Sequence, residues 1–211
     1  MQKKSMEMEP TAKLLVNLYG TRKGYVLWNG TKSYYKILRA AYKDISKNKN
    51  GDYLPFAFFT LCASTLEYSL NFILTDYCFY KYGPDKYKPF AEGYIAISFA
   101  KKLLMTPSIV TEGQLTFSEE HKSYKNLLEL ISLRNKILHN KDFLEEFDLP
   151  IIKKTEKNIE FQIRTEPNYI NRLNKDNCLN FGNSLGDFKR YLMTPVLNHE
   201  LVENEMIIKI K

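Results

Sequence analysis

The chain has few of the residues that form disulfides or hold metal ions. Its 211 residues include three cysteines, Cys62, Cys78 and Cys178, and three histidines. An odd number of cysteines without metal-ligand spacing predicts neither a disulfide framework nor a zinc site. Two of the cysteines lie in an apolar helical stretch, where a free thiol usually packs as a small hydrophobic side chain. Three histidines are too few to predict a multi-histidine metal centre. We also expect no bound cofactor.

Segments that mark membrane, secreted and several enzyme classes are also missing. The N-terminus has no apolar signal-peptide core, and the most apolar segment, residues 53–75, contains Glu67, Asn71 and several hydroxyl groups. The chain has no Gly-x-Ser-x-Gly motif of serine hydrolases and no Gly-x-x-x-x-Gly-Lys-Ser/Thr loop of nucleotide hydrolases. We therefore expect a soluble, cytoplasmic protein that uses neither of these chemistries.

Acidic residues are fewer than basic residues in this chain. The chain has 31 Lys and Arg residues against 24 Asp and Glu, a net charge of +7, which suits a polyanionic partner such as nucleic acid. The lysines are scattered, however, without a block of five or more. Lys, Asn, Ile and Tyr are all abundant, as AT-rich codon usage would produce. The charge alone does not decide between an RNA partner and background composition.

The composition, 44% hydrophobic with 15 Tyr and 13 Phe, indicates a globular fold. Its periodicity predicts a mainly all-α protein, an up-and-down bundle of four or five helices with a small C-terminal β element. We expect residues 1–30 to form a tail and loop, 31–148 the bundle, and 149–211 an extension packed on the same domain. The expected helices cover about residues 32–44, 56–80, 86–104 (closed by Thr106-Pro107), 118–146 and 179–192. The expected strands cover residues 159–163 and 206–210, which could pair with each other.

The fourth expected helix carries an arginine where its side chains should be apolar. From Leu127 to Phe143 the leucines and isoleucines gather on one wide arc of the helix. Arg134 falls near the centre of this arc, Asn135 falls within it, and His139 falls at its edge. A guanidinium keeps its proton, so inside a core it must be paired or face a wet cleft. This stretch is therefore a candidate functional site.

The second expected helix carries a stripe of polar residues. Its members recur at spacings of four, three, four and four residues: Thr60, Ser64, Glu67, Asn71 and Thr75. The stripe is either the solvent-facing side of the helix, or it faces the fourth helix so that Glu67 or Asn71 meets Arg134. Helix axes pack about 8–10 Å apart, within reach of both side chains. In the second case Glu67, Asn71 and Ser64 form a supporting polar cluster.

An arginine and a histidine on one helix suit phosphodiester chemistry. Arg134 would bind a phosphate through its planar fork and stabilise the charge of the transition state. His139 would serve as general base or acid, because a histidine titrates near neutral pH. Five residues separate the two by about 7.5 Å of rise and about 140° of turn. They do not share one face, so a groove between two copies of the helix is favoured, which makes a homodimer plausible.

The stretch Leu133-Arg134-Asn135-Lys136-Ile137-Leu138-His139-Asn140 resembles the signature of HEPN domains. That signature is an arginine, then a preferred Asn, Asp or His, then a histidine after four to six intervening residues. Residues 65–71 resemble the earlier helix of that family, which bears a polar or acidic residue near the motif. The resemblance covers roughly residues 31–145. It implies a metal-independent RNA endonuclease that acts as a dimer, with Asn135 orienting the catalytic pair or contacting the phosphate. Such domains are common in toxin–antitoxin pairs, phage defence and RNA processing, so an antitoxin or operon partner is a further expectation.

Other interpretations of the same residues stay open. Some HEPN domains act only as binding or dimerisation modules, and this chain could be one of them. Arg134 could then form a buried ion pair with Glu67 that holds two helices in register, and His139 could interact with the helix dipole. Helix-turn-helix DNA binding needs an exposed basic recognition helix, and Leu127–Leu138 is too apolar for that role.

Overall fold

The computed structural model describes residues 12–15, 25–47, 53–138 and 168–210. Its helices are α1 (Thr31–Ser46), α2 (Tyr53–Tyr82), α3 (Tyr87–Ile95), α4 (Phe99–Val110), α5 (Lys122–Leu138), α6 (Asn168–Asn171), α7 (Lys175–Phe188) and α8 (Thr194–Leu197). A π-helical turn, η1 (Lys189–Met193), joins α7 to α8. The strands are β1 (Ala12–Leu15), β2 (Tyr25–Trp28), β3 (Leu115–Phe117) and β4 (Ile207–Lys209). The protein is mainly helical, with small antiparallel strand elements.

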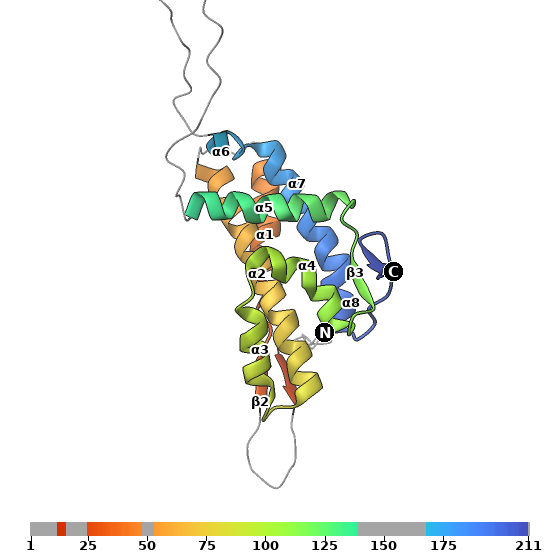
Figure 1. Cartoon of the computed structure of the whole chain (residues 1–211). Coiled ribbons are helices and arrows are strands. Elements are labelled where there is room, and N and C mark those ends of the chain that lie inside the picture. Colours follow the sequence, from red (N-terminus) through yellow and green to blue (C-terminus); the bar gives the residue numbers. More distant parts are fainter. Residues whose placement is uncertain (1–11, 16–24, 48–52, 139–167, 211) are drawn as a thin grey trace, which may run out of the picture.

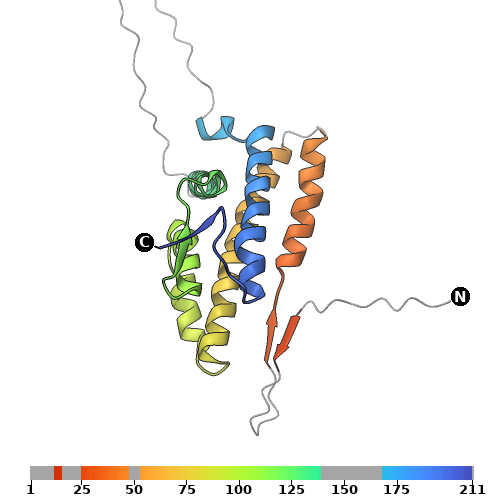
Figure 2. The ribbon, with the colours of Figure 1, turned by 90° about the vertical axis from the view of Figure 1, so that its right-hand side faces the viewer.

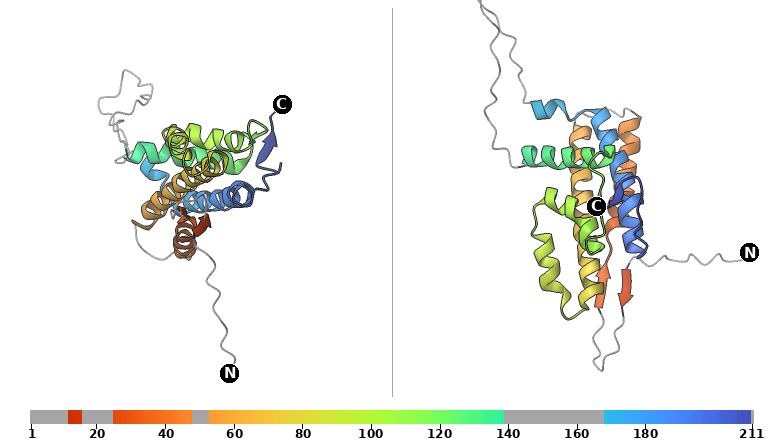
Figure 3. Two further views of the ribbon diagram at one scale, coloured as in Figure 1. Left: turned by 90° about the horizontal axis from the view of Figure 1, so that it is seen from below. Right: turned by 45° about the vertical axis from the view of Figure 1, so that its right-hand side comes forward.

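The long helices form three layers. Seen from below, α2 and α7 lie between α1 on one side and α4 and α5 on the other (Figure 3, left). α1, α2 and α7 run alongside one another (Figure 2), whereas α5 crosses them (Figure 1) and is seen end-on in Figure 2. This crossing brings side chains of α5 against both α2 and α7.

The central helix is α2, because it is apolar almost all round. Its 30 residues bury side chains such as Phe58, Leu66, Leu70 and Ile73. Among the described residues it is the helix long and apolar enough to cross a membrane, yet 61% of its most apolar 18-residue window is buried inside the fold. Such burial is typical of the core helix of a soluble protein, and it is consistent with the expectation of a soluble protein.

The expected third helix, residues 86–104, is two helices, so that prediction is wrong. α3 ends at Ile95, and Ser98 has an extended backbone (φ −56°, ψ 146°) before α4 begins at Phe99. The break reorients the chain so that Phe99 and Leu103 enter the core, whereas the buried residue of α3 is Ala91. Burial of the α4 side chains overrides helix propensity at this point.

Proline 107 does not end α4, contrary to expectation. The helix continues to Val110, and the Thr111 amide donates to the Pro107 carbonyl at 3.0 Å. A proline this close to the end of a helix removes a single backbone hydrogen bond. The helix stops instead where Glu112 and Gly113 take φ values of 54° and 88°, because a left-handed backbone cannot continue a right-handed helix.

The C-terminal strand has a partner that the sequence analysis did not name. β4 lies within residues 206–210, as expected, but it pairs with β3 in the register Phe117↔Ile207. The other expected strand, residues 159–163, lies outside the described residues. In the expected N-terminal tail and loop, β1 and β2 form an antiparallel pair with Leu15 opposite Tyr25. Strands of three or four residues are too short to show a period of two.

The C-terminal part of the chain contributes to the core. α7 begins at Lys175, where the Asn174 side chain caps the helix by accepting from the Asn177 amide at 3.0 Å. It packs against α1, α2 and α5. Gly182 allows a close approach, because a Cβ there would lie 2.7 Å from a ring carbon of Tyr42. Gly182 is thus needed for packing, and the core extends beyond residue 148.

Candidate functional site

Helix α5 presents Arg134 at the edge of the core. Leu127, Leu130 and Ile131 are buried, and the Arg134 side chain is 24% exposed. Asn135, expected within the same apolar arc, is exposed. In the last turn of α5, Ile137 still packs against the core, whereas Leu138 is exposed. His139 lies outside the described residues.

The Arg134 guanidinium contacts Glu67, Asn135 and Phe99. Its Nη2 lies 3.3 Å from Oε2 of Glu67, whose side chain is 35% exposed. Its Nη1 donates to Oδ1 of Asn135 at 3.1 Å. Its Cζ lies 5.9 Å from the centroid of the Phe99 ring, within cation–π range. A carboxylate, an amide and an aromatic ring thus restrict the orientation of the planar fork.

The polar stripe of α2 divides between two environments. Glu67 meets α5 through Arg134, and Asn71, one turn further along, accepts a hydrogen bond from α4. The hydroxyl groups of Thr60 and Thr75 donate to carbonyls of their own helix at 3.0 and 2.8 Å. Ser64 is exposed. The structure therefore brings Glu67 to Arg134 of α5 and Asn71 to Lys102 of α4.

Lys102 is a member of this site that the sequence analysis missed. It is 3% exposed, and its Nζ donates to Oδ1 of Asn71 at 2.6 Å. Burial lowers the pKa of this ammonium group, and the neighbouring Glu67 carboxylate acts in the opposite direction. A signal does exist, because Phe99, Lys102, Leu103 and Thr106 follow the helical i, i+3, i+4, i+7 spacing and are all buried. Lys101, the residue before Lys102, is exposed.

We call this group of side chains the Arg134 cluster: Glu67 and Asn71 from α2, Phe99 and Lys102 from α4, and Arg134 and Asn135 from α5. Chemically, the partly exposed side chain of Arg134 can bind an oxyanion, and the partly exposed Glu67 carboxylate can accept hydrogen bonds.

The two described histidines lie apart from the cluster. His121 precedes α5 and accepts a hydrogen bond from the Ser123 amide at 3.3 Å. It lies 13 residues before Arg134, about 20 Å along the helix axis. His199 follows α8 and packs edge-on against Tyr80, with ring centroids 4.5 Å apart. Neither belongs to the cluster, so an imidazole there must come from His139, five residues after Arg134.

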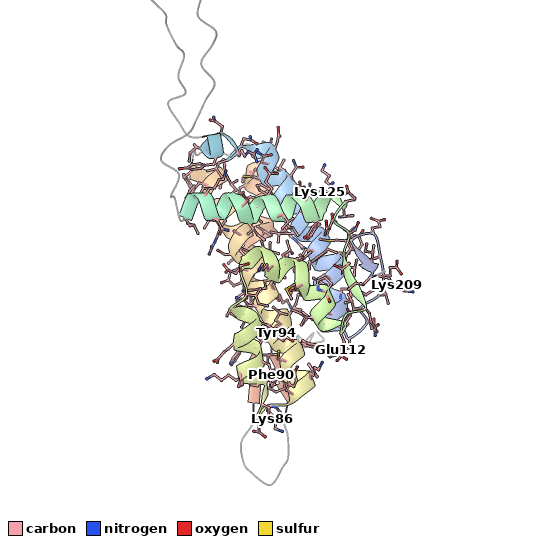
Figure 4. The ribbon with its side chains drawn as sticks, viewed as in Figure 1. Lys86, Phe90, Tyr94, Glu112, Lys125 and Lys209 are labelled. Carbon is pink, nitrogen blue, oxygen red and sulfur yellow. The ribbon has the colours of Figure 1, made fainter. Side chains whose placement is uncertain are left out.

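A cavity of about 380 Å³ lies elsewhere, between the C-terminal third of α2, the turn after α4 and the segment after α8. Asp76 and Tyr80 line it from α2, and Glu112, at the end of α4 in Figure 4, lines it from the turn. Glu112 is paired there with Lys81 at 2.8 Å. Asp76 follows Glu67 by nine residues, about 13.5 Å and half a turn around α2. This cavity is therefore separate from the Arg134 cluster.

Comparison with known proteins provides no relative. No protein-family model, curated protein or solved structure matches the chain significantly. Within the described residues, no group of three or more His, Cys, Asp or Glu side chains is arranged to hold a metal ion. The functional argument therefore depends on the Arg134 cluster and on the sequence around it.

Proposed function

We propose that the protein is a metal-independent RNA endonuclease of the HEPN type, with Arg134, Asn135 and His139 as its catalytic residues. The observation that carries the proposal is the state of Arg134. It is an arginine within an otherwise apolar helix face, held by Glu67 and Phe99 yet 24% exposed. A purely structural ion pair has no need of exposure, whereas a phosphate ligand must reach the guanidinium.

In the proposed reaction, the 2′-oxygen of one ribose attacks the adjacent phosphorus. His139 accepts the 2′-hydroxyl proton, and the bond from phosphorus to the 5′-oxygen of the next nucleotide breaks. The leaving oxygen takes up a proton from a general acid, the histidine of a second copy or water. The products are a 2′,3′-cyclic phosphate and a 5′-hydroxyl. Arg134 stabilises the extra negative charge on the phosphoryl oxygens through its fork.

The role of Asn135 follows from its contact. Its Oδ1 accepts from Nη1 of Arg134, so it fixes one arm of the guanidinium. Its side chain is exposed, and its amide NH₂ can donate to a phosphate oxygen. Glu67 fixes the other arm through Nη2. The guanidinium is thus held in a set orientation, which lowers the ordering cost of binding a phosphate.

A homodimer is part of the proposal. In a continuous helix, His139 would be turned about 140° from Arg134 around the axis, so one copy would not direct both groups at one phosphate. Two α5 helices facing each other across a two-fold axis would place the arginine of one protomer near the histidine of the other. The exposed Leu138 lies between these positions and provides an apolar contact for such a pairing.

The test is cleavage of mixed single-stranded RNA in excess EDTA by the wild type and by His139→Ala. We expect the wild type to cleave and His139→Ala to lose activity by about 10²-fold or more, as for loss of a general acid or base. His199→Asn is the matched control, because it removes a histidine outside the Arg134 cluster and asparagine tolerates the φ of 58° found there.

Equal cleavage by the wild type and His139→Ala would overturn the assignment of His139. Absence of cleavage by an intact wild-type dimer over varied RNA substrates would overturn the nuclease proposal. The paired Glu67 and Arg134 would then favour a HEPN-like RNA-binding or assembly module.

A further inference from the structure

Lys102 is an unusual residue for its position. A lysine loses hydration and rotamer freedom when it is buried, and lysines are rarely buried unless they are paired. Here the side chain crosses the interface between α4 and α2 and ends at Oδ1 of Asn71, 2.6 Å away. The α4 face around it, Phe99, Leu103 and Thr106, is otherwise free of charge. A methionine would fill the same space without the cost of desolvation.

The charge of Lys102 matters because of Glu67. The Glu67 carboxylate contacts Arg134 at 3.3 Å, so it cancels much of the positive potential that the guanidinium offers to an anion. Lys102 comes from α4 and its Nζ ends at Asn71, one turn along α2 from Glu67. At this position its positive charge acts on the same carboxylate. Two cationic side chains from different helices, Arg134 and Lys102, thus interact with one carboxylate. Because Lys102 balances part of the negative charge of Glu67, more of the positive potential of Arg134 is left for an anion.

We propose that Lys102 is a positioning residue that turns the Glu67–Arg134 ion pair into an anion-binding site. Its ammonium group does not touch the ligand, because it is 3% exposed. It acts through Glu67, whose charge it balances, and through Asn71, which it anchors beside Glu67 on α2. The identity of the anion, an RNA phosphodiester, rests on the proposed function, whereas the effect of Lys102 on anion affinity does not require cleavage.

The experiment measures binding of a fluorescent, fully 2′-O-methylated RNA oligomer at low salt. This probe has the phosphates of RNA but no 2′-hydroxyl, so it is bound and not cleaved. Lys102→Met removes the charge and keeps an apolar side chain of similar length. Lys101→Met is the matched control, because it removes the same charge from the next residue, which is exposed. Lys102→Arg retains the charge.

We expect Lys102→Met to bind the oligomer roughly five- to tenfold more weakly than Lys101→Met, because it removes one positive charge from a partly screened site. Lys102→Arg should stay within about threefold of the wild type. Glu67→Gln combined with Lys102→Met should recover the affinity, because it removes the carboxylate that Lys102 balances. A merely structural role for Lys102 would not produce this recovery.

Stability is measured on the same proteins by thermal unfolding. If Lys102→Met does not fold, Lys102→Gln replaces it, because a glutamine amide can still donate to Asn71. Equal affinity of Lys102→Met and Lys101→Met would overturn the proposal. Failure of both uncharged variants to fold would also overturn it, because Lys102 would then serve the fold. If the wild type binds the oligomer but cleaves no RNA, the nuclease proposal fails while the role of Lys102 is still tested.

Discussion

Replacement of Arg134 should separate activity from stability. The side chain is 24% exposed, and its contacts include a partly exposed ion pair, a ring contact and a hydrogen bond to the exposed Asn135. An ion pair of this kind contributes about 0.2–1 kcal/mol, and a cation–π contact at a partly exposed site about 0.5–1 kcal/mol. Glu67, at 35% exposure, regains water when its partner is removed. Arg134→Met should therefore cost at most about 2 kcal/mol, and Arg134→Lys less.

The expected loss of activity is much larger. Removal of one preorganised donor to a transition-state oxyanion typically costs about 2.7–4 kcal/mol, or about 10²–10³ in rate. Arg134→Lys keeps the positive charge but loses the planar fork, so it should still lose most of the activity. Arg134→Met should lose at least as much.

Thermal unfolding and RNA cleavage on the same preparations provide the assay. For a protein of this size 1 kcal/mol corresponds to roughly 2–4 °C in Tm, so Arg134→Met should melt less than about 8 °C below the wild type. A large fall in Tm with proportional loss of activity would refute the reasoning, since Arg134 would then be a structural residue. Full activity of Arg134→Lys would refute the role of the fork.

Three further predictions concern the fold. Leu127→Ala should lower the free energy of unfolding by about 2–5 kcal/mol in denaturant titrations, because Leu127 is fully buried. Gly182→Ala should destabilise by about 1–3 kcal/mol through its clash with Tyr42, whereas Gly186→Ala, with open space at its Cβ, should stabilise by up to about 1 kcal/mol; equal effects in thermal melts would contradict the packing of α7. Burial raises the pKa of Cys178 from 9.0 to about 11, so its contribution to stability is complete below about pH 9 and is lost as pH rises to about 11. Between pH 8 and 11, the free energy of unfolding of Cys178→Ala should therefore fall by about 1–2 kcal/mol less than that of the wild type, as measured by urea titrations. If the two proteins lose stability in parallel as the pH rises, this prediction is wrong.

α1 could be predicted because its periodicity displays a buried face, and α2 because it is apolar over most of its length. α1 and α2 lie within two or three residues of the expected ranges at each end. The break between α3 and α4 could not be predicted, because residues 96–98 contain no proline or glycine and the cause is tertiary. The short strands form through pairing of segments far apart in the chain, such as β3 with β4. A local sequence pattern does not indicate such long-range pairing.

The candidate site could be predicted in part for a similar reason. Arg134 and Glu67 are charged residues in apolar stretches, a contrast that a single sequence displays. Lys102 lies beside Lys101, so the pair resembles an ordinary exposed surface. The helical spacing puts Lys102 on the same face as Phe99 and Leu103, but it does not show that this face is buried. Its ligand, Asn71, lies 31 residues away in the chain.

The most direct test of the account is the chemistry of the ends that the wild-type protein leaves on RNA in excess EDTA. Attack by the 2′-hydroxyl with Arg134 and His139 predicts 2′,3′-cyclic phosphates and 5′-hydroxyls, detected by mass spectrometry of a defined oligonucleotide. A substrate with 2′-deoxyribose at the cleaved position should resist cleavage. Products with 3′-hydroxyl and 5′-phosphate ends, or cleavage that requires a divalent cation, would contradict the account.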